Sequence, residues 1–137
     1  MLKRLLMSLA VSAAMALLYA PAGVAAETGS TPRISDERGI RIAVMLRNIR
    51  NDAKTWDVEV TLETHTQALS DDLTKSAVLT ADGKQYAPIS WEGPAPGGHH
   101  RKGLLRFKAI VPPPQSLELQ IRLAGEAAPR SFKWLLK

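Results

Sequence analysis

Cysteine is absent from this chain of 137 residues. The protein therefore has no disulfide bond, no thiolate ligand for a metal and no thiol nucleophile, and its stability has to come from packing. Aromatic residues make up only 5% of the chain, and histidine occurs three times. Because no segment keeps an apolar period of 3.6 residues over several turns, we expect very little helix.

Signatures of common enzyme sites are missing as well. The sequence has no G-x-S-x-G nucleophile elbow, and Gly97-Gly98 lacks the further glycines and the following helix of a phosphate-binding loop. Asp71 and Asp72 form the best remaining acid–base pair, but neighbouring carboxylates in a polar loop are usually solvated. We therefore predict that the protein is not an enzyme.

The N-terminus has the pattern of a signal peptide. Lys3 and Arg4 precede an uncharged apolar run over 5–18, and small residues at 24–26 supply a cleavage site. About 14 apolar residues are too few to cross a bilayer, which takes roughly 20, so a retained N-terminal anchor is the less favoured alternative. We predict a signal peptide over 1–26 and a periplasmic or secreted protein with no stable membrane insertion after cleavage.

The rest of the chain has the size of one domain. We expect a flexible lead-in over 27–37, rich in Gly, Ser, Thr and Pro, followed by a single domain over 38–137. Cleavage removes two of the 18 basic residues and none of the 13 acidic ones, so the net charge falls from +5 to +3. This charge is modest and scattered, so we predict no nucleic-acid partner.

Apolar and polar residues alternate through most of this domain, which is the period of half-buried β-strands. The alternation predicts seven strands, at 40–46, 56–63, 76–80, 84–89, 105–111, 117–123 and 132–136. One helical turn capped by Ser70 is expected between 67 and 75, and Asp82-Gly83 is typical of a two-residue hairpin turn. These features predict an all-β fold, a seven-stranded antiparallel immunoglobulin-like sandwich, with a small closed barrel as the alternative.

The three histidines are predicted to meet at one end of this sandwich. His65 directly follows the second predicted strand, whereas His99 and His100 precede the fifth in a segment broken by proline and glycine. In immunoglobulin-like order these two strands are antiparallel neighbours, so the end of one lies beside the start of the other. Neutral imidazole binds Cu²⁺ and Zn²⁺ well, so His65, His99 and His100 form a candidate site for a divalent transition metal.

A second interpretation of this end uses no metal. His65 then bonds to loop backbone, His99 stacks on Trp91 or faces solvent, and the loop over 91–102 contacts a protein or glycan partner. Trp91 is the one tryptophan expected at the surface, because Trp56 and Trp134 have inward parity in their strands. The sequence leaves both interpretations of this non-enzymatic binding module open.

Several blocks of the sequence carry a resemblance. Trp-x-Val-x-Val-x-Leu-x-Thr-His at 56–65, Trp-Glu-Gly at 91–93, Gly-Gly-His-His-Arg at 97–101 and Gly-x-Leu-x-Phe at 103–107 are similar to blocks in a group of exported bacterial and archaeal immunoglobulin-like β-sandwich proteins. The resemblance implies a sandwich fold and a location outside the cytoplasm. It implies no activity, ligand or catalytic residue.

Overall fold

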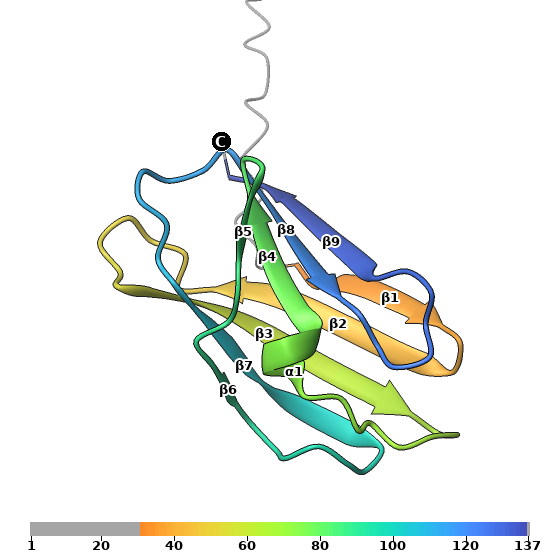
Figure 1. The fold of residues 1–137 in the computed structure, drawn as a ribbon. Coiled ribbons are helices and arrows are strands. Elements are labelled where there is room, and N and C mark those ends of the chain that lie inside the picture. The colour runs from red at the N-terminus through yellow and green to blue at the C-terminus, as the bar shows by residue number, and fades with distance from the viewer. Residues whose placement is uncertain (1–30, 137) are drawn as a thin grey trace, which may run out of the picture.

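The computed structural model describes residues 31–136, so the predicted signal peptide at 1–26 and the first part of the lead-in lie outside the described residues. The described chain forms two antiparallel sheets packed face to face (Figure 1). Its elements are β1 (Arg33–Glu37), β2 (Ile40–Arg47), β3 (Thr55–Thr64), α1 (Leu73–Ser76), β4 (Ala77–Ala81), β5 (Lys84–Tyr86), β6 (Ser90–Glu92), β7 (His100–Lys108), β8 (Ser116–Ile121) and β9 (Arg130–Leu135). The sheet orders are β1-β2-β3-β7-β6 and β5-β4-β8-β9, which confirms an all-β sandwich.

The predicted count of seven strands is wrong, because the described residues contain nine. β1 lies within the segment expected to be a lead-in, and β6 adds three residues at the opposite edge of the same sheet. Neither strand has the alternation of a core strand, and Ile34 in β1 is 53% exposed. Edge strands of this kind are held mainly by backbone bonds to one neighbour, which leave no signal in side-chain periodicity.

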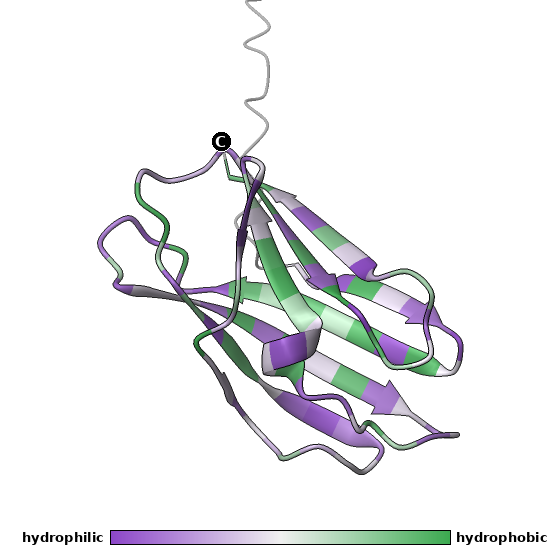
Figure 2. Ribbon diagram, viewed as in Figure 1, coloured by the Kyte–Doolittle hydropathy of each residue, from purple (hydrophilic) through white to green (hydrophobic). Residues whose placement is uncertain are grey.

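The core lies between the two sheets and follows the predicted alternation. In β2, β3, β8 and β9 every second residue is buried, and these apolar positions form bands along the strands in Figure 2. Trp56 and Trp134 are 1% and 2% exposed, as their parity predicts, and Phe107 is fully buried. Burial of each such side chain contributes about 2–3 kcal/mol.

The connection before β4 contains one helical turn, as expected, but its cap is Asp72 and not Ser70. Asp72 has extended backbone angles, and its carboxylate accepts hydrogen bonds from the N–H and the hydroxyl of Thr74 at 3.0 and 2.7 Å. A carboxylate in this position satisfies N–H groups that a helix start leaves unpaired, which is why α1 begins at Leu73.

The hairpin predicted at Asp82-Gly83 is confirmed. Both residues have positive φ angles, 46° and 84°, and the register pairs Ala81 with Lys84 across the two-residue turn. β5 ends at Tyr86, short of the predicted 89, because Pro88 lacks the N–H that a longer ladder requires.

A buried arginine joins the two sheets along the side where β1 and β9 lie. The Arg130 side chain is 1% exposed and holds the Glu126 carboxylate through two bonds, of 3.0 and 2.8 Å. It also donates to the carbonyl oxygens of Ile40 at 2.6 Å and Glu37 at 2.8 Å. The β1–β2 turn and the loop before β9 are therefore tied together through one guanidinium group.

Candidate functional site

The predicted pairing of the second and fifth core strands is confirmed by β3 and β7. Their antiparallel register sets Glu63 opposite His100, and the Thr64 N–H donates to the His99 carbonyl oxygen at 3.0 Å. Segments more than thirty residues apart are thus brought side by side at one end of the sandwich. We call this the histidine end, and it carries the loops over 65–72, 93–99 and 122–129.

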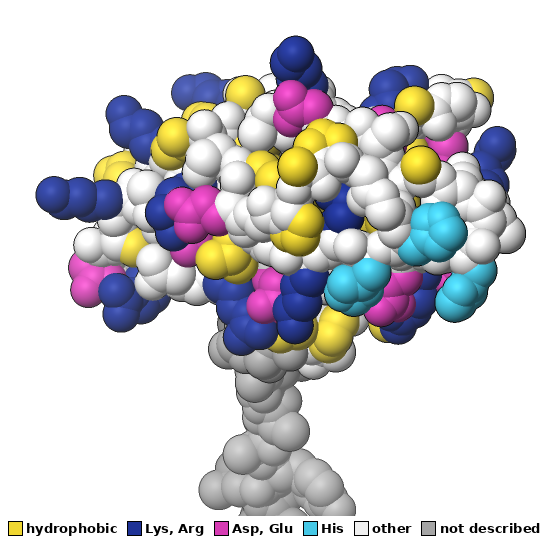
Figure 3. Space-filling model, turned by 90° about the horizontal axis from the view of Figure 1, so that it is seen from below, with side chains coloured by type: hydrophobic (Ala, Val, Ile, Leu, Met, Phe, Trp, Pro, Cys, Tyr) yellow, Lys and Arg dark blue, Asp and Glu magenta, His cyan; other side chains and the backbone are white. Residues whose placement is uncertain are grey.

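All three histidine side chains are exposed at this end. Figure 3 shows them gathered at one side of the view, with acidic side chains between them. His100 Nδ1 lies 3.4 Å from Glu63 Oε1, while the side chains of His65 and His99 make no hydrogen bond within residues 31–136. Over the same residues, no group of three His, Asp or Glu side chains is placed to hold one metal ion. The register thus brings the two histidine segments together at one end, and the metal site stays a prediction.

The loop over 93–99 is fixed by backbone bonds to the segment that follows His65. The Leu69 N–H donates to the Gly98 carbonyl oxygen at 2.9 Å, and the Gly97 N–H donates to the Leu69 carbonyl oxygen at 2.8 Å. Gly97 and Gly98 have φ angles of 124° and 70°. Side chains other than glycine rarely adopt these angles, so the Gly-Gly pair lets the loop turn into this contact.

Arg101 is the residue that sequence reasoning missed. Its side chain is buried at 1% exposure and donates to the carbonyl oxygens of Asp71 at 2.7 Å, Pro94 at 3.2 Å and Leu69 at 3.4 Å. Burial lowers the pKa of the Arg101 guanidinium, and the nearby carboxylates of Asp71 and Asp72 oppose this shift. One cation thus holds the 65–72 and 93–99 loops against β7.

The alternation along β7 does indicate that the Arg101 side chain is buried. Counting back by two from Phe107 and Leu105 along the inward face reaches Gly103 and then Arg101, so its side chain points between the sheets. A buried arginine needs several acceptors, and the neighbouring loop carbonyl groups supply them for its two terminal nitrogens.

Trp91 is half-buried against the core and is not available as an exposed aromatic platform. Its indole N–H donates to the Pro94 carbonyl oxygen at 2.9 Å, and the Arg101 guanidinium lies 5.4 Å from its ring centre. A Cβ added to Gly103 would lie 2.5 Å from the Glu92 carbonyl oxygen and 2.9 Å from the Trp91 ring. The Trp-Glu-Gly and Gly-x-Leu-x-Phe blocks therefore meet in one close packing contact. Arg101, and not His99, lies over the Trp91 ring.

Asp71 and Asp72 both make structural hydrogen bonds. Asp71 Oδ1 accepts the Ala124 N–H at 2.9 Å, which ties the 65–72 loop to the turn after β8. Asp72 caps α1, and its hydrogen bonds from the hydroxyl and the N–H of Thr74 lower its pKa below the ordinary value for an aspartate. The two carboxylates are directed to different partners and do not face each other across a shared proton.

Comparisons with known proteins supply no relative from which a role can be taken: no family model, no curated protein and no solved structure matches the chain. Within residues 31–136, no helix combines the length and the apolar character needed to cross a membrane. A function for the protein is therefore inferred from the geometry of the histidine end.

Proposed function

We propose that the protein is an exported, non-enzymatic binding module that captures a protein partner at its histidine end. The contact surface is the rim, defined as residues 65–68 and 94–100, nearly all of which are exposed. Export follows from the N-terminal pattern of residues 1–26. The intact mass of the protein recovered from the periplasm or medium tests this step, since it should lack those residues.

The strand orders support an immunoglobulin-like form of the sandwich. β2-β3-β7-β6 has the order of strands A-B-E-D in that fold, and β4-β8-β9 has the order of strands C-F-G. β1 and β5 are then additional strands at the edges. Domains of this architecture commonly bind through loops gathered at one end, which is where the rim lies.

The observation that carries the proposal is that hydrogen bonds from the inner side hold the rim in place. Arg101 and the Leu69 backbone hold the 93–99 loop with three hydrogen bonds, and Arg101 donates two more to the 65–72 loop, while the outer side of the 93–99 loop stays free for contacts. Ordering a loop on binding costs free energy, so a loop that is ordered beforehand binds more tightly for the same contacts. A protein partner suits this surface better than a glycan because Trp91, the nearest aromatic ring, is already covered by Arg101.

The test compares three forms of the full chain as bait for exported proteins of the same cells. The double variant H99A/H100A removes two rim side chains, and Lys84→Ala changes an exposed residue in the hairpin at the opposite end. We expect one partner to be captured by wild type and Lys84→Ala, lost with the double variant, and unaffected by EDTA. Equal capture by all three forms would contradict the proposal, as would capture of a glycan alone.

A divalent transition metal is the second candidate ligand, favoured by the β3–β7 register. That register sets His100 beside Glu63 and brings His65 and His99 to the same end. Binding of Cu²⁺ or Zn²⁺ requires local movement of the exposed imidazoles, with water or Glu63 completing the ligand set. Calorimetric titration of the untagged full chain is decisive. We expect saturable binding that His65→Ala, His99→Ala and His100→Ala each weaken, and binding no tighter than about millimolar would end this candidate.

A further inference from the structure

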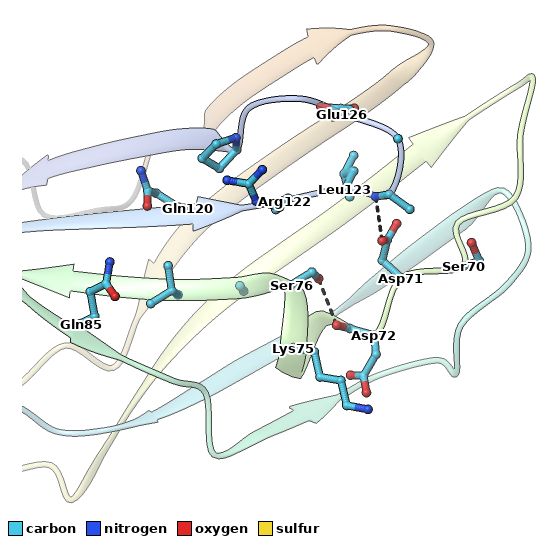
Figure 4. Close-up of a pocket in the computed structure, with 15 residues that line it drawn as sticks. Ser70, Asp71, Asp72, Lys75, Ser76, Gln85, Gln120, Arg122, Leu123 and Glu126 are labelled. Atoms are coloured by element: carbon cyan, nitrogen blue, oxygen red, sulfur yellow. Dashed lines mark hydrogen bonds between the residues drawn. The ribbon is translucent and has the colours of Figure 1, made fainter.

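A groove separate from the rim lies on the outer face of the second sheet. It has a volume of about 730 Å³ and runs between α1 and the turn over 122–129 (Figure 4). β4 and β8 form its floor, where Val78 gives it an apolar base. Sites of this size are typical of small ligands and oligosaccharide units.

The three carboxylates around the groove are each engaged by the protein. Asp71 accepts the Ala124 N–H, and Asp72 caps α1. Glu126 is held by two bonds from buried Arg130. Their best acceptor positions are largely used, Arg130 balances the charge of Glu126, and Arg101 lies near Asp71 and Asp72, so they do not make the groove a cation site.

The two cations of the groove are less engaged. Arg122 lies in the middle of Figure 4, between Gln120 and the turn, and donates one bond to the Ala127 carbonyl oxygen at 3.2 Å. Within residues 31–136 neither Arg122 nor Lys75 forms an ion pair within 4.0 Å, although Lys75 helps to lower the pKa of Asp72. Both side chains are exposed, so their remaining N–H groups are free to donate to a ligand.

Neutral polar groups and small apolar groups complete the lining. Gln85 and Gln120 carry carboxamides on one side, and Ser70 carries a hydroxyl on the other. Carboxamides and hydroxyls both donate and accept hydrogen bonds, which matches sugar hydroxyl groups. Val78 and Pro129 offer apolar contact for the C–H face of a ring.

We propose that this groove binds an acidic oligosaccharide, with one carboxylate of the sugar held by Arg122, a second by Lys75, and its hydroxyls held by Gln85 and Gln120. A guanidinium group fits a carboxylate through two parallel bonds, whereas a neutral sugar leaves the charge of both cations unused. The site goes beyond the protein-capturing rim and does not depend on it.

The experiment follows the amide and arginine side-chain NMR signals of the full chain during titration with tetragalacturonate. Maltotetraose serves as the neutral tetrasaccharide. We expect saturable shifts at the Gln85 and Gln120 carboxamides and at Arg122 with the acidic probe, and binding at least tenfold weaker with the neutral one. Loss of one charge-assisted bond in Arg122→Gln or Lys75→Gln should weaken binding about tenfold.

Lys108→Gln is the matched control. It removes the same charge at an exposed position at the end of β7, in the other sheet, and should leave the affinity unchanged. The proposal is overturned if no saturable shift occurs below about 10 mM ligand. It is also overturned if both tetrasaccharides bind equally, or if Lys108→Gln weakens binding as much as Arg122→Gln. Each of these outcomes is independent of partner capture at the rim.

Discussion

Arg101→Met should loosen the histidine end and destabilise the whole domain. The change removes the guanidinium but keeps a long apolar side chain in the same space, so the main loss is of hydrogen bonds. The two shorter of these bonds go to the carbonyl oxygens of Asp71 at 2.7 Å and Pro94 at 3.2 Å, which is the long end of the usual range. Bonds to a charged donor contribute about 1.5 kcal/mol or more each.

The contact with the Trp91 ring adds about 0.5–1 kcal/mol. Relief from burying a charge offsets part of this sum, so we expect Arg101→Met to lower the free energy of unfolding by about 3 kcal/mol. Arg101→Lys keeps the charge but not the planar fork that reaches several carbonyl groups, so it should recover less than half of the loss.

Urea unfolding followed by tryptophan fluorescence measures the global effect, and hydrogen exchange of the Leu69 and Gly97 amides measures the local one. Both amides bond across the two loops in the wild type, so their protection should fall in Arg101→Met. Lys102→Met is the control, because Lys102 is exposed and its ion pair with Glu59 is long at 3.7 Å, so we expect less than about 0.5 kcal/mol. A loss below about 1 kcal/mol in Arg101→Met, with unchanged protection at Leu69, would refute the role assigned to Arg101.

Three further predictions concern other contacts. Gly103→Ala should destabilise the domain by about 2–3 kcal/mol in the same urea assay, because the added Cβ would lie 2.5 Å from a backbone carbonyl oxygen. Gly125→Ala is its control: the added Cβ would lie in open space, and the φ angle of +80° alone should cost about 1 kcal/mol. Glu126→Gln removes the nearer of the two carboxylates paired with buried Arg130, Glu37 remaining at 3.4 Å, and should cost about 2 kcal/mol, measured as a fall in the thermal midpoint. Asp72 has a lowered pKa in the folded state, so its contribution to stability is present above about pH 4 and is lost as pH falls through that pKa. Asp72→Asn should therefore show a shallower loss of stability in acid, and an unchanged acid slope would contradict the cap.

Much of the fold follows from local periodicity. The alternation in β3 assigns Trp56, Val58, Val60 and Leu62 to one face, and the structure buries all four. The alternation did not identify β1, because this strand contains one exposed isoleucine and no buried residue. Its place in the sheet depends on backbone bonds to β2, for which its side chains carry no pattern.

One part of the candidate site could likewise be predicted from the sequence, and another part could not. The places of His65 and His99 at the ends of predicted strands, together with immunoglobulin-like strand order, predicted that β3 and β7 bring them to one end, because antiparallel neighbours pair end to start. A period of two residues does not encode side-chain or loop geometry. It therefore could not predict where the imidazoles lie within that end, or which backbone bonds hold the loop beneath them.

The sequence by itself determined that the described chain is built from strands and which side chains enter the core, since both depend on alternation along one strand. With immunoglobulin-like strand order it also predicted which two segments meet at the histidine end. Only the tertiary structure decided that Arg101 is buried below the rim and that the carboxylates of the α1 groove are already engaged. The physical reason is that a buried charge is stable only where acceptors converge on it. The acceptors of Arg101 come from loops up to 32 residues away in the chain.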